Sequence, residues 1–220
     1  MSSTPLQNSS FAALRSFIRP RAPVEQCELC SAELAPNHQH LIEPDNRKLV
    51  CACDACAILF SNQGDGKYRR VPRRIRFLPD FRLTDAQWDS LLIPINMAFF
   101  FHSVPAGKVV ALYQSPAGPT ESLLDLESWA EITQENPILQ GMEPDVEALL
   151  VNRVARLGSA RGQAVAEYYL VPIDECYKLT GLIRAHWHGL SGGTEVWEEI
   201  GRFFAGLQER ATTIREAARA

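Results

Sequence analysis

Two short segments hold five of the six cysteines in this 220-residue chain. The first is CELC, residues 27–30, and the second is CACDAC, residues 51–56. The tight turn of a Cys-x-x-Cys unit lets two thiolates converge on one ion, and a second unit after a short spacer completes a tetrahedral set. The two segments therefore predict a metal site.

Cys27, Cys30, Cys53 and Cys56 form the natural pairs, and four thiolates are the ligands that structural Zn²⁺ prefers. An iron–sulfur cluster could use the same four thiolates. Cys51 lies two residues before Cys53, so on a strand both face the same side. Cys51 could border the metal, or replace Cys53 if the turn is wider. Four thiolates leave no open position for water, which favours a structural ion over a catalytic one.

The residues between the cysteine segments predict a β-hairpin. Residues 38–43, HQHLIE, alternate as a strand does, residues 44–47, PDNR, have turn chemistry, and residues 48–53 return as a second strand. His38 and His40 share one face of the first strand, where one of them could reach the metal as a ligand or support a ligand. Alternatively, both are packing or surface histidines. A Cys-x-x-Cys turn (a knuckle), a hairpin and a second such knuckle, in this order, predict a unit like a zinc ribbon.

Two partial patterns raise the question of catalysis. Residues 40–56 faintly resemble the HNH nuclease pattern through His40 and Asn46, but Ala57 stands where the last metal-binding histidine commonly follows. Cys176 precedes the HWHG segment, residues 186–189, and a Cys–His pair can act as a nucleophile. Nothing in the sequence orients that pair, so we expect Cys176 to be a small buried residue. We therefore do not expect an enzyme.

The bulk composition is that of an ordinary globular protein, with 46% hydrophobic residues, 22% charged residues and a net charge of −4. The longest apolar segment, residues 91–101, is too short to span a membrane. Residues 67–76 hold six basic side chains among ten and could contact nucleic acid. A solvated linker entering a strand explains them better, and the overall acidity agrees with it. We therefore do not expect a nucleic-acid partner.

The chain divides by composition into a flexible leader (1–24), a zinc-ribbon-like metal knuckle (25–62) and an α+β domain (63–220). The leader lacks the apolar core of a secretory signal, so we expect a cytoplasmic protein, in which clustered cysteines bind metals more often than they form disulfides. For the large domain we expect a mixed, mainly antiparallel sheet and a long C-terminal helix. In its first half we expect a strand at 74–79, a helix at 83–92 with Thr84 and Gln87 as a capping box, and a hairpin of 97–103 and 107–115. A loop at 116–122 and a strand or short turn before Trp129 should follow. In its second half we expect a helix at 143–154, a strand at 164–174 and a helix at 192–220 capped by Thr194.

Several segments in combination resemble a known bacterial family. They are CELC, residues 38–60, PIDECYKLTGLIRAHWHGLSGG (172–193) and VWEEIGRFF (196–204). The family is uncharacterised and mainly actinobacterial, and its members are encoded beside the oxygen-tolerant, high-affinity uptake type of nickel–iron hydrogenase. The resemblance covers residues 25 to 207. It implies an accessory or maturation role in which the protein binds a hydrogenase subunit or another hydrogenase accessory protein, and it transfers no catalytic residue.

Overall fold

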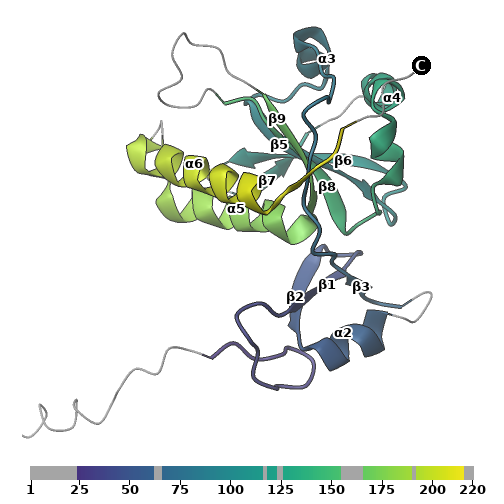
Figure 1. Cartoon of the computed structure of the whole chain (residues 1–220), viewed down its shortest axis with the longest axis vertical. Coiled ribbons are helices and arrows are strands. Elements are labelled where there is room, and N and C mark those ends of the chain that lie inside the picture. The colour runs from purple at the N-terminus through teal and green to yellow at the C-terminus, as the bar shows by residue number, and fades with distance from the viewer. Residues whose placement is uncertain are drawn as a thin grey trace, which may run out of the picture.

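The computed structural model describes residues 24–61, 66–115, 118–122, 126–154, 166–189 and 192–215. A small three-stranded unit lies beside a larger seven-stranded sheet that has helices on both faces (Figure 1). This arrangement confirms the predicted α+β class, with a cysteine-bearing N-terminal unit and a long C-terminal helix. Apart from Val24, the predicted leader lies outside the described residues.

The small unit is built on the predicted hairpin. Strand β1 (Gln39–Glu43) pairs antiparallel with β2 (Lys48–Ala52), so that alternate side chains face a compact core. Helix α2 (Asp54–Ser61) follows β2 and covers the hairpin, and β3 (Arg69–Arg70) adds a third strand beside β1. We had not predicted α2. The buried core of this unit consists of Cys27, Leu34, Leu41, Val50, Ala52, Cys56 and Ala57.

The larger sheet has the strand order β10-β4-β9-β8-β5-β6-β7. Every neighbouring pair is antiparallel except β10 with β4. The predicted hairpin of 97–103 and 107–115 is confirmed as β5 and β6. The strands are β4 (Arg76–Phe77), β5 (Met97–Ser103), β6 (Lys108–Ser115), β7 (Gly118–Glu121), β8 (Glu147–Asn152), β9 (Glu167–Pro172) and β10 (Thr212–Thr213).

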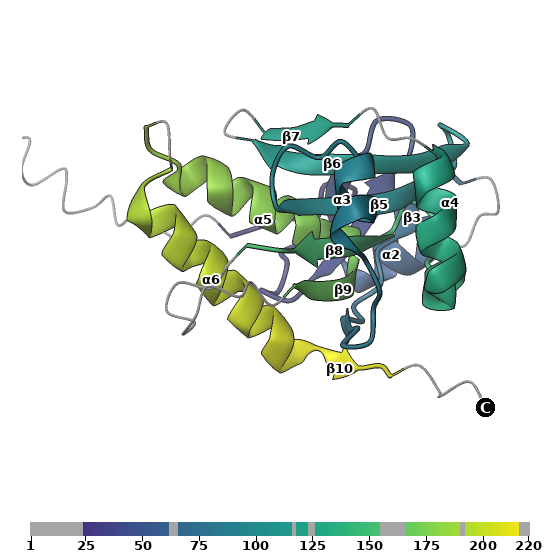
Figure 2. The ribbon, with the colours of Figure 1, turned by 90° about the horizontal axis from the view of Figure 1, so that it is seen from above.

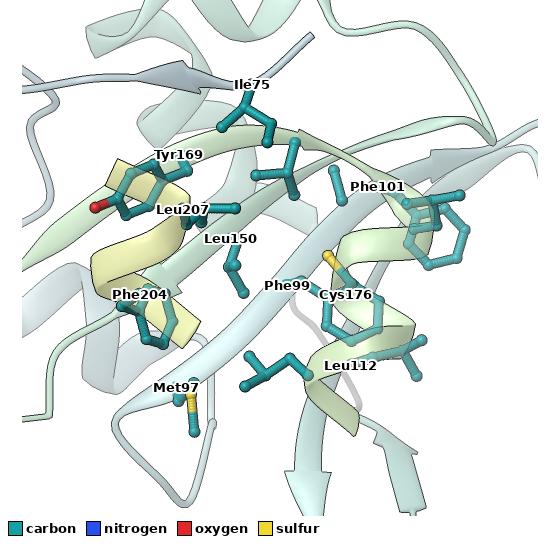
Figure 3. Packing of buried hydrophobic residues seen from close by; sticks show 14 of the residues in the cluster. Ile75, Met97, Phe99, Phe101, Leu112, Leu150, Tyr169, Cys176, Phe204 and Leu207 are labelled. Atoms are coloured by element: carbon teal, nitrogen blue, oxygen red, sulfur yellow. The ribbon is translucent and has the colours of Figure 1, made fainter. Parts of the chain in front are cut away.

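Helices cover the larger sheet from both sides, so its central strands are buried on both faces (Figure 2). Phe99 and Leu150 face the core beneath α5 and α6, whereas Phe100 and Leu149 face the opposite core. Figure 3 shows Phe99 and Leu150 in the first core, with Cys176 of α5 beside them. The helices are α3 (Asp85–Ser90), α4 (Leu126–Glu135), the 3₁₀ helix η1 (Pro137–Gly141), α5 (Ile173–His186) and α6 (Gly193–Arg210).

The predicted helix at 143–154 is wrong, because this segment contains β8, the strand between β5 and β9. The helix preference of its residues is outweighed by hydrogen bonding to a strand on each side and by burial of the whole strand. Glu147, which favoured a helix, is fully buried and accepts hydrogen bonds from Arg74 at 2.8 Å and Arg76 at 3.0 Å. Burial alone would raise the pKa of Glu147, but the hydrogen bond from Arg74 and the other contacts of the carboxylate hold it below its ordinary value.

Four smaller predictions also differ from the structure. The helix expected at 192–220 ends at Arg210, because the chain then enters β10 and pairs with β4. The loop expected at 116–122 contains β7, an edge strand on β6, and the segment around Trp129 forms α4 instead of a strand or turn. Helix α6 begins after Gly192 in the left-handed region (φ 85°), so Thr194 is not its cap. A Cβ at Gly192 would lie 2.8 Å from Val196 Cγ1, which explains why glycine makes this turn.

Direct contacts hold the small unit against the larger domain. Ile42 of β1 is buried in the larger core, and the backbone N–H of Val71 donates to the carbonyl of His40 at 3.0 Å. His40 Nδ1 lies 2.6 Å from Asp174 Oδ2, in the first turn of α5. The small unit therefore has a defined position on the larger domain.

Candidate metal centre

The four predicted cysteine ligands converge in the small unit. Cys27 and Cys30 lie in the turn before β1, Cys53 follows β2, and Cys56 lies in the first turn of α2. All four sulfurs lie within 4.8 Å of one another. Cys30 Sγ and Cys53 Sγ are 3.7 Å apart, and Zn–S bonds of ~2.3 Å in a tetrahedron separate sulfurs by about 3.8 Å. The four thiols are thus placed to hold one metal ion.

Local backbone bonds shape both knuckles. In the first, Cys27 N–H donates to the Ala32 carbonyl at 2.8 Å, and Ser31 N–H donates to the Cys27 carbonyl at 2.7 Å. Ser31 takes a left-handed conformation (φ 62°) that turns the chain back. In the second, the start of α2 brings Cys56 N–H to 3.5 Å from Cys53 Sγ. Each pair of thiols is therefore positioned by local bonds of its own turn.

Glu28 ties the first knuckle to β2. Its backbone N–H donates to the Cys51 carbonyl at 2.9 Å, and its carboxylate accepts from Cys51 N–H, also at 2.9 Å. Lys48 Nζ lies 3.2 Å from the second carboxylate oxygen. The Cys51 N–H bond is the main cause of a lowered pKa for Glu28. These bonds bring the first pair of cysteines to the second pair.

The thiols of Cys27 and Cys56 differ in their readiness to ionise. Burial opposes ionisation of Cys27, but backbone N–H groups of Cys53, Leu29 and Cys30 outweigh it and lower the pKa of Cys27 to about 6. Burial and the neighbouring thiols raise the pKa of Cys56 to about 12. A bound cation would supply the charge that stabilises the remaining thiolates. The set is therefore suited to a cation.

Cys51, His38 and His40, the possible additional ligands, gather in a separate group. One ligand atom from each lies within 4.8 Å of the others, apart from the four-cysteine group. Cys51 faces His40 across the β1–β2 ladder, which places the two side chains on the same side of the hairpin. The structure thus groups Cys53, not Cys51, with the other three cysteines.

The partial catalytic patterns are not assembled. Asn46 accepts a hydrogen bond from Lys48 N–H within the hairpin turn, whereas His40 is bound to Asp174. Cys176 is fully buried, and burial raises the pKa of its thiol well above the ordinary value. His186 pairs with Glu195 at 2.9 Å. The expectation that Cys176 is a small core residue is confirmed.

The basic stretch 67–76 is bound to acidic and polar groups of the protein. Its six basic side chains all have partners within the described part of the chain, and Val71 and Ile75 are buried between them. The carboxylate partners of four of these side chains lower the positive charge available to a phosphate backbone. The partners are Glu43 for Lys67, Asp145 for Arg69, Gln39 for Arg70, the Asn37 carbonyl for Arg73, Glu143 and Glu147 for Arg74, and Glu147 for Arg76.

Sequence reasoning found the four cysteines but missed the contact between His40 and Asp174. The two residues are 134 positions apart, and no spacing in the sequence connects them. In the sequence, Asp174 stands two residues before Cys176, far from both cysteine segments. A lone carboxylate in the first turn of a helix is common, because it complements the helix dipole, so it gave no signal of its own.

The fold and the site define an α+β protein whose small N-terminal unit carries a cluster of four cysteines that could hold a metal ion. The chain belongs to the family of unknown function DUF5947, whose pattern matches residues 26–211. Neither a curated protein nor a solved structure matches the chain. Among the described residues, no helix combines the length and the apolar character needed to cross a membrane.

Proposed function

We propose that this protein is a non-catalytic accessory protein that acts by binding another protein and is held in shape by a structural Zn²⁺ ion. The observation that carries the proposal is the set of four converging thiols of Cys27, Cys30, Cys53 and Cys56. Four protein ligands close the coordination of Zn²⁺ and leave no site for a substrate or a reactive water. The ion therefore serves the fold.

Zinc suits this unit better than an iron–sulfur cluster. The small unit buries few large apolar side chains of its own, so a bound ion would add much of its folding free energy. Two Cys-x-x-Cys turns joined by a hairpin match the usual ligand spacing of structural zinc. An iron–sulfur cluster on the same thiolates remains the alternative that metal analysis decides.

The proposed partner is a subunit of a nickel–iron hydrogenase or another of its accessory proteins, in the cytoplasm. This part of the proposal rests on the resemblance of the sequence segments described above. The surface of α2 offers a place for such contact, because Ile58 and Leu59 are large apolar side chains that are 54% and 60% exposed. Exposed neighbouring apolar side chains often mark protein-binding surfaces.

Metal analysis and a partner pull-down test the proposal together. Protein purified without oxygen should contain zinc and no iron, and Cys27→Ser should lose the tightly bound zinc. Hydrogenase components should co-purify with the wild type and less with Leu59→Ser. Val104→Ser is the matched control, since Val104 is an exposed apolar residue in the β5–β6 turn. Iron in place of zinc, or no association together with no hydrogenase defect in a deletion strain, would contradict the proposal.

A further inference from the structure

A second group of metal-binding side chains lies beside the four-cysteine site. His38 precedes β1, His40 is in β1, and Cys51 faces His40 from β2. One ligand atom from each lies within 4.8 Å of the others, and the two imidazole rings are 4.8 Å apart at 87°. Two imidazoles and one thiol are a donor set for a borderline divalent ion such as Zn²⁺. None of these three side chains belongs to the four-cysteine group.

The hydrogen bonds of the two imidazoles leave the ligand nitrogens free. His38 Nδ1 lies 3.0 Å from the Ala35 carbonyl, which can only accept, so in the neutral imidazole this nitrogen carries the proton and Nε2 carries the lone pair. The His38 side chain is only 8% exposed. Within the described part of the chain, the buried His38 Nε2 has no hydrogen-bond partner. A buried acceptor without a partner is costly, and a metal ion would satisfy it.

His40 is oriented by a carboxylate from the other unit. Its Nδ1 lies 2.6 Å from Asp174 Oδ2, so Nε2 is the ring nitrogen that can bind a metal ion. Histidines that bind metals usually donate their second ring N–H to a carboxylate in this way, which fixes the tautomer and raises the basicity of the ligand nitrogen. Asp174 is in the first turn of α5, so the group depends on the contact between the small unit and the larger domain.

Two of the three residues, His38 and His40, border a cleft between the two units, and Cys51 faces His40 from β2. The cleft has a volume of about 490 Å³, and His38, His40 and Asp174 are among its lining residues. Three protein ligands beside a solvent-accessible space leave a fourth coordination position for water or an exchangeable ligand. This differs from the four-cysteine site, whose protein ligands close the coordination by themselves.

We propose that His38, His40 and Cys51 form a second metal site, which binds a borderline divalent ion such as Zn²⁺ and leaves one coordination position open to the cleft. Asp174 is a positioning residue that holds His40. With fewer protein ligands, this ion exchanges more readily than the one held by four cysteines. The proposal does not depend on the hydrogenase partner.

Metal stoichiometry of the full chain tests the second site. Wild-type protein titrated with Zn²⁺ should bind two ions, one tightly and one more weakly. His40→Ala and Cys51→Ser should each keep the tight ion and lose the weaker one. His186→Ala is the matched control, because His186 lies at the end of α5 with Glu195 as its partner, and it should bind two ions. A wild type that saturates at one ion, or variants that still bind two, would overturn the proposal.

Two further measurements keep the test decisive if a variant folds poorly. Asp174→Asn changes no ligand, and it should weaken the second ion by about 10- to 100-fold without changing the tight ion. Equal affinity in this variant and the wild type would show that Asp174 does not position a ligand. Titration with Co²⁺ should give a second spectral component with weaker thiolate charge-transfer absorption, since only one sulfur is bound. Its absence from the wild type would contradict a site that includes Cys51.

Discussion

Replacing Cys30 by serine should weaken the tightly bound zinc without disturbing the core of the small unit. Cys30 is exposed, whereas Cys27 and Cys56 are buried among apolar side chains, so Cys30→Ser removes a ligand and little packing. A serine hydroxyl keeps nearly the same size but does not supply a thiolate. The change therefore isolates the metal–ligand bond.

The magnitude follows from the four-ligand geometry. Structural zinc contributes about 10–16 kcal/mol to small zinc-binding domains at neutral pH. Divided evenly over the four sulfurs that surround the site, one ligand accounts for about 2.5–4 kcal/mol. At ~1.4 kcal/mol for each tenfold change, the dissociation constant should rise by about 10²- to 10³-fold.

Competition with a chromophoric chelator measures the affinity, and amide hydrogen exchange shows where the protein loosens. In Cys30→Ser at limiting zinc, amides of β1 and β2 should exchange faster, while those of β5 and β8 should keep their protection, because they belong to the larger sheet. Cys176→Ala is the control, since Cys176 is in the core of the larger domain and should leave zinc affinity unchanged. An unchanged zinc affinity in Cys30→Ser would refute Cys30 as a ligand.

Three further predictions concern the larger domain, each measured by urea unfolding. Gly192→Ala should lower the free energy of unfolding by about 1–3 kcal/mol, because its Cβ would lie 2.8 Å from Val196 Cγ1 at a left-handed φ of 85°. Glu147→Gln should lower it by about 3 kcal/mol at pH 7, because it leaves Arg76 without its buried carboxylate partner. The pKa of Glu147 is lowered in the folded state, so its carboxylate stabilises the fold above the unfolded pKa of ~4.3. This stabilisation is lost as the pH falls through the folded pKa. The difference in free energy of unfolding between Glu147→Gln and the wild type should therefore disappear in acid. Thr84→Ala should cost about 1 kcal/mol, because the Thr84 hydroxyl accepts from Gln87 N–H at the start of α3.

Each of these predictions has a result that would count against its reasoning. Gly201 is a helical glycine where an added Cβ meets nothing within 4 Å. If Gly192→Ala and Gly201→Ala are equally stable, the close approach of a Cβ at Gly192 does not lower the free energy of unfolding. A stability gap for Glu147→Gln that stays constant from neutral to acid pH would show that the carboxylate charge is not what stabilises the strand. Equal stability of Thr84→Ala and the wild type would mean that the capping box adds nothing measurable to α3.

The two cysteine turns, the two hairpins and the capping box of α3 could be predicted because each depends on residues close together in sequence. The turn that brings Cys27 to Cys30 closes within a few residues, and the alternation of 38–43 and 48–53 describes two paired strands with their turn. The apolar stripe of the last helix, with Val196, Ile200 and Phe204 buried, follows from the helical period in the same way. In these elements the local preference and the final fold agree.

Only the tertiary structure decided the rest. Residues 147–152 have helix-forming chemistry, yet strands on both sides and two arginines around Glu147 make them the buried strand β8. The sequence by itself determined that a cysteine site exists on a small hairpin unit, but it left Cys51 and Cys53 as alternatives. The structure groups Cys53 with the other thiols and turns Cys51 toward His40, which a carboxylate 134 residues away holds in place. Such pairings depend on which distant segments of the chain pack together, and this packing cannot be predicted from the local sequence around each residue.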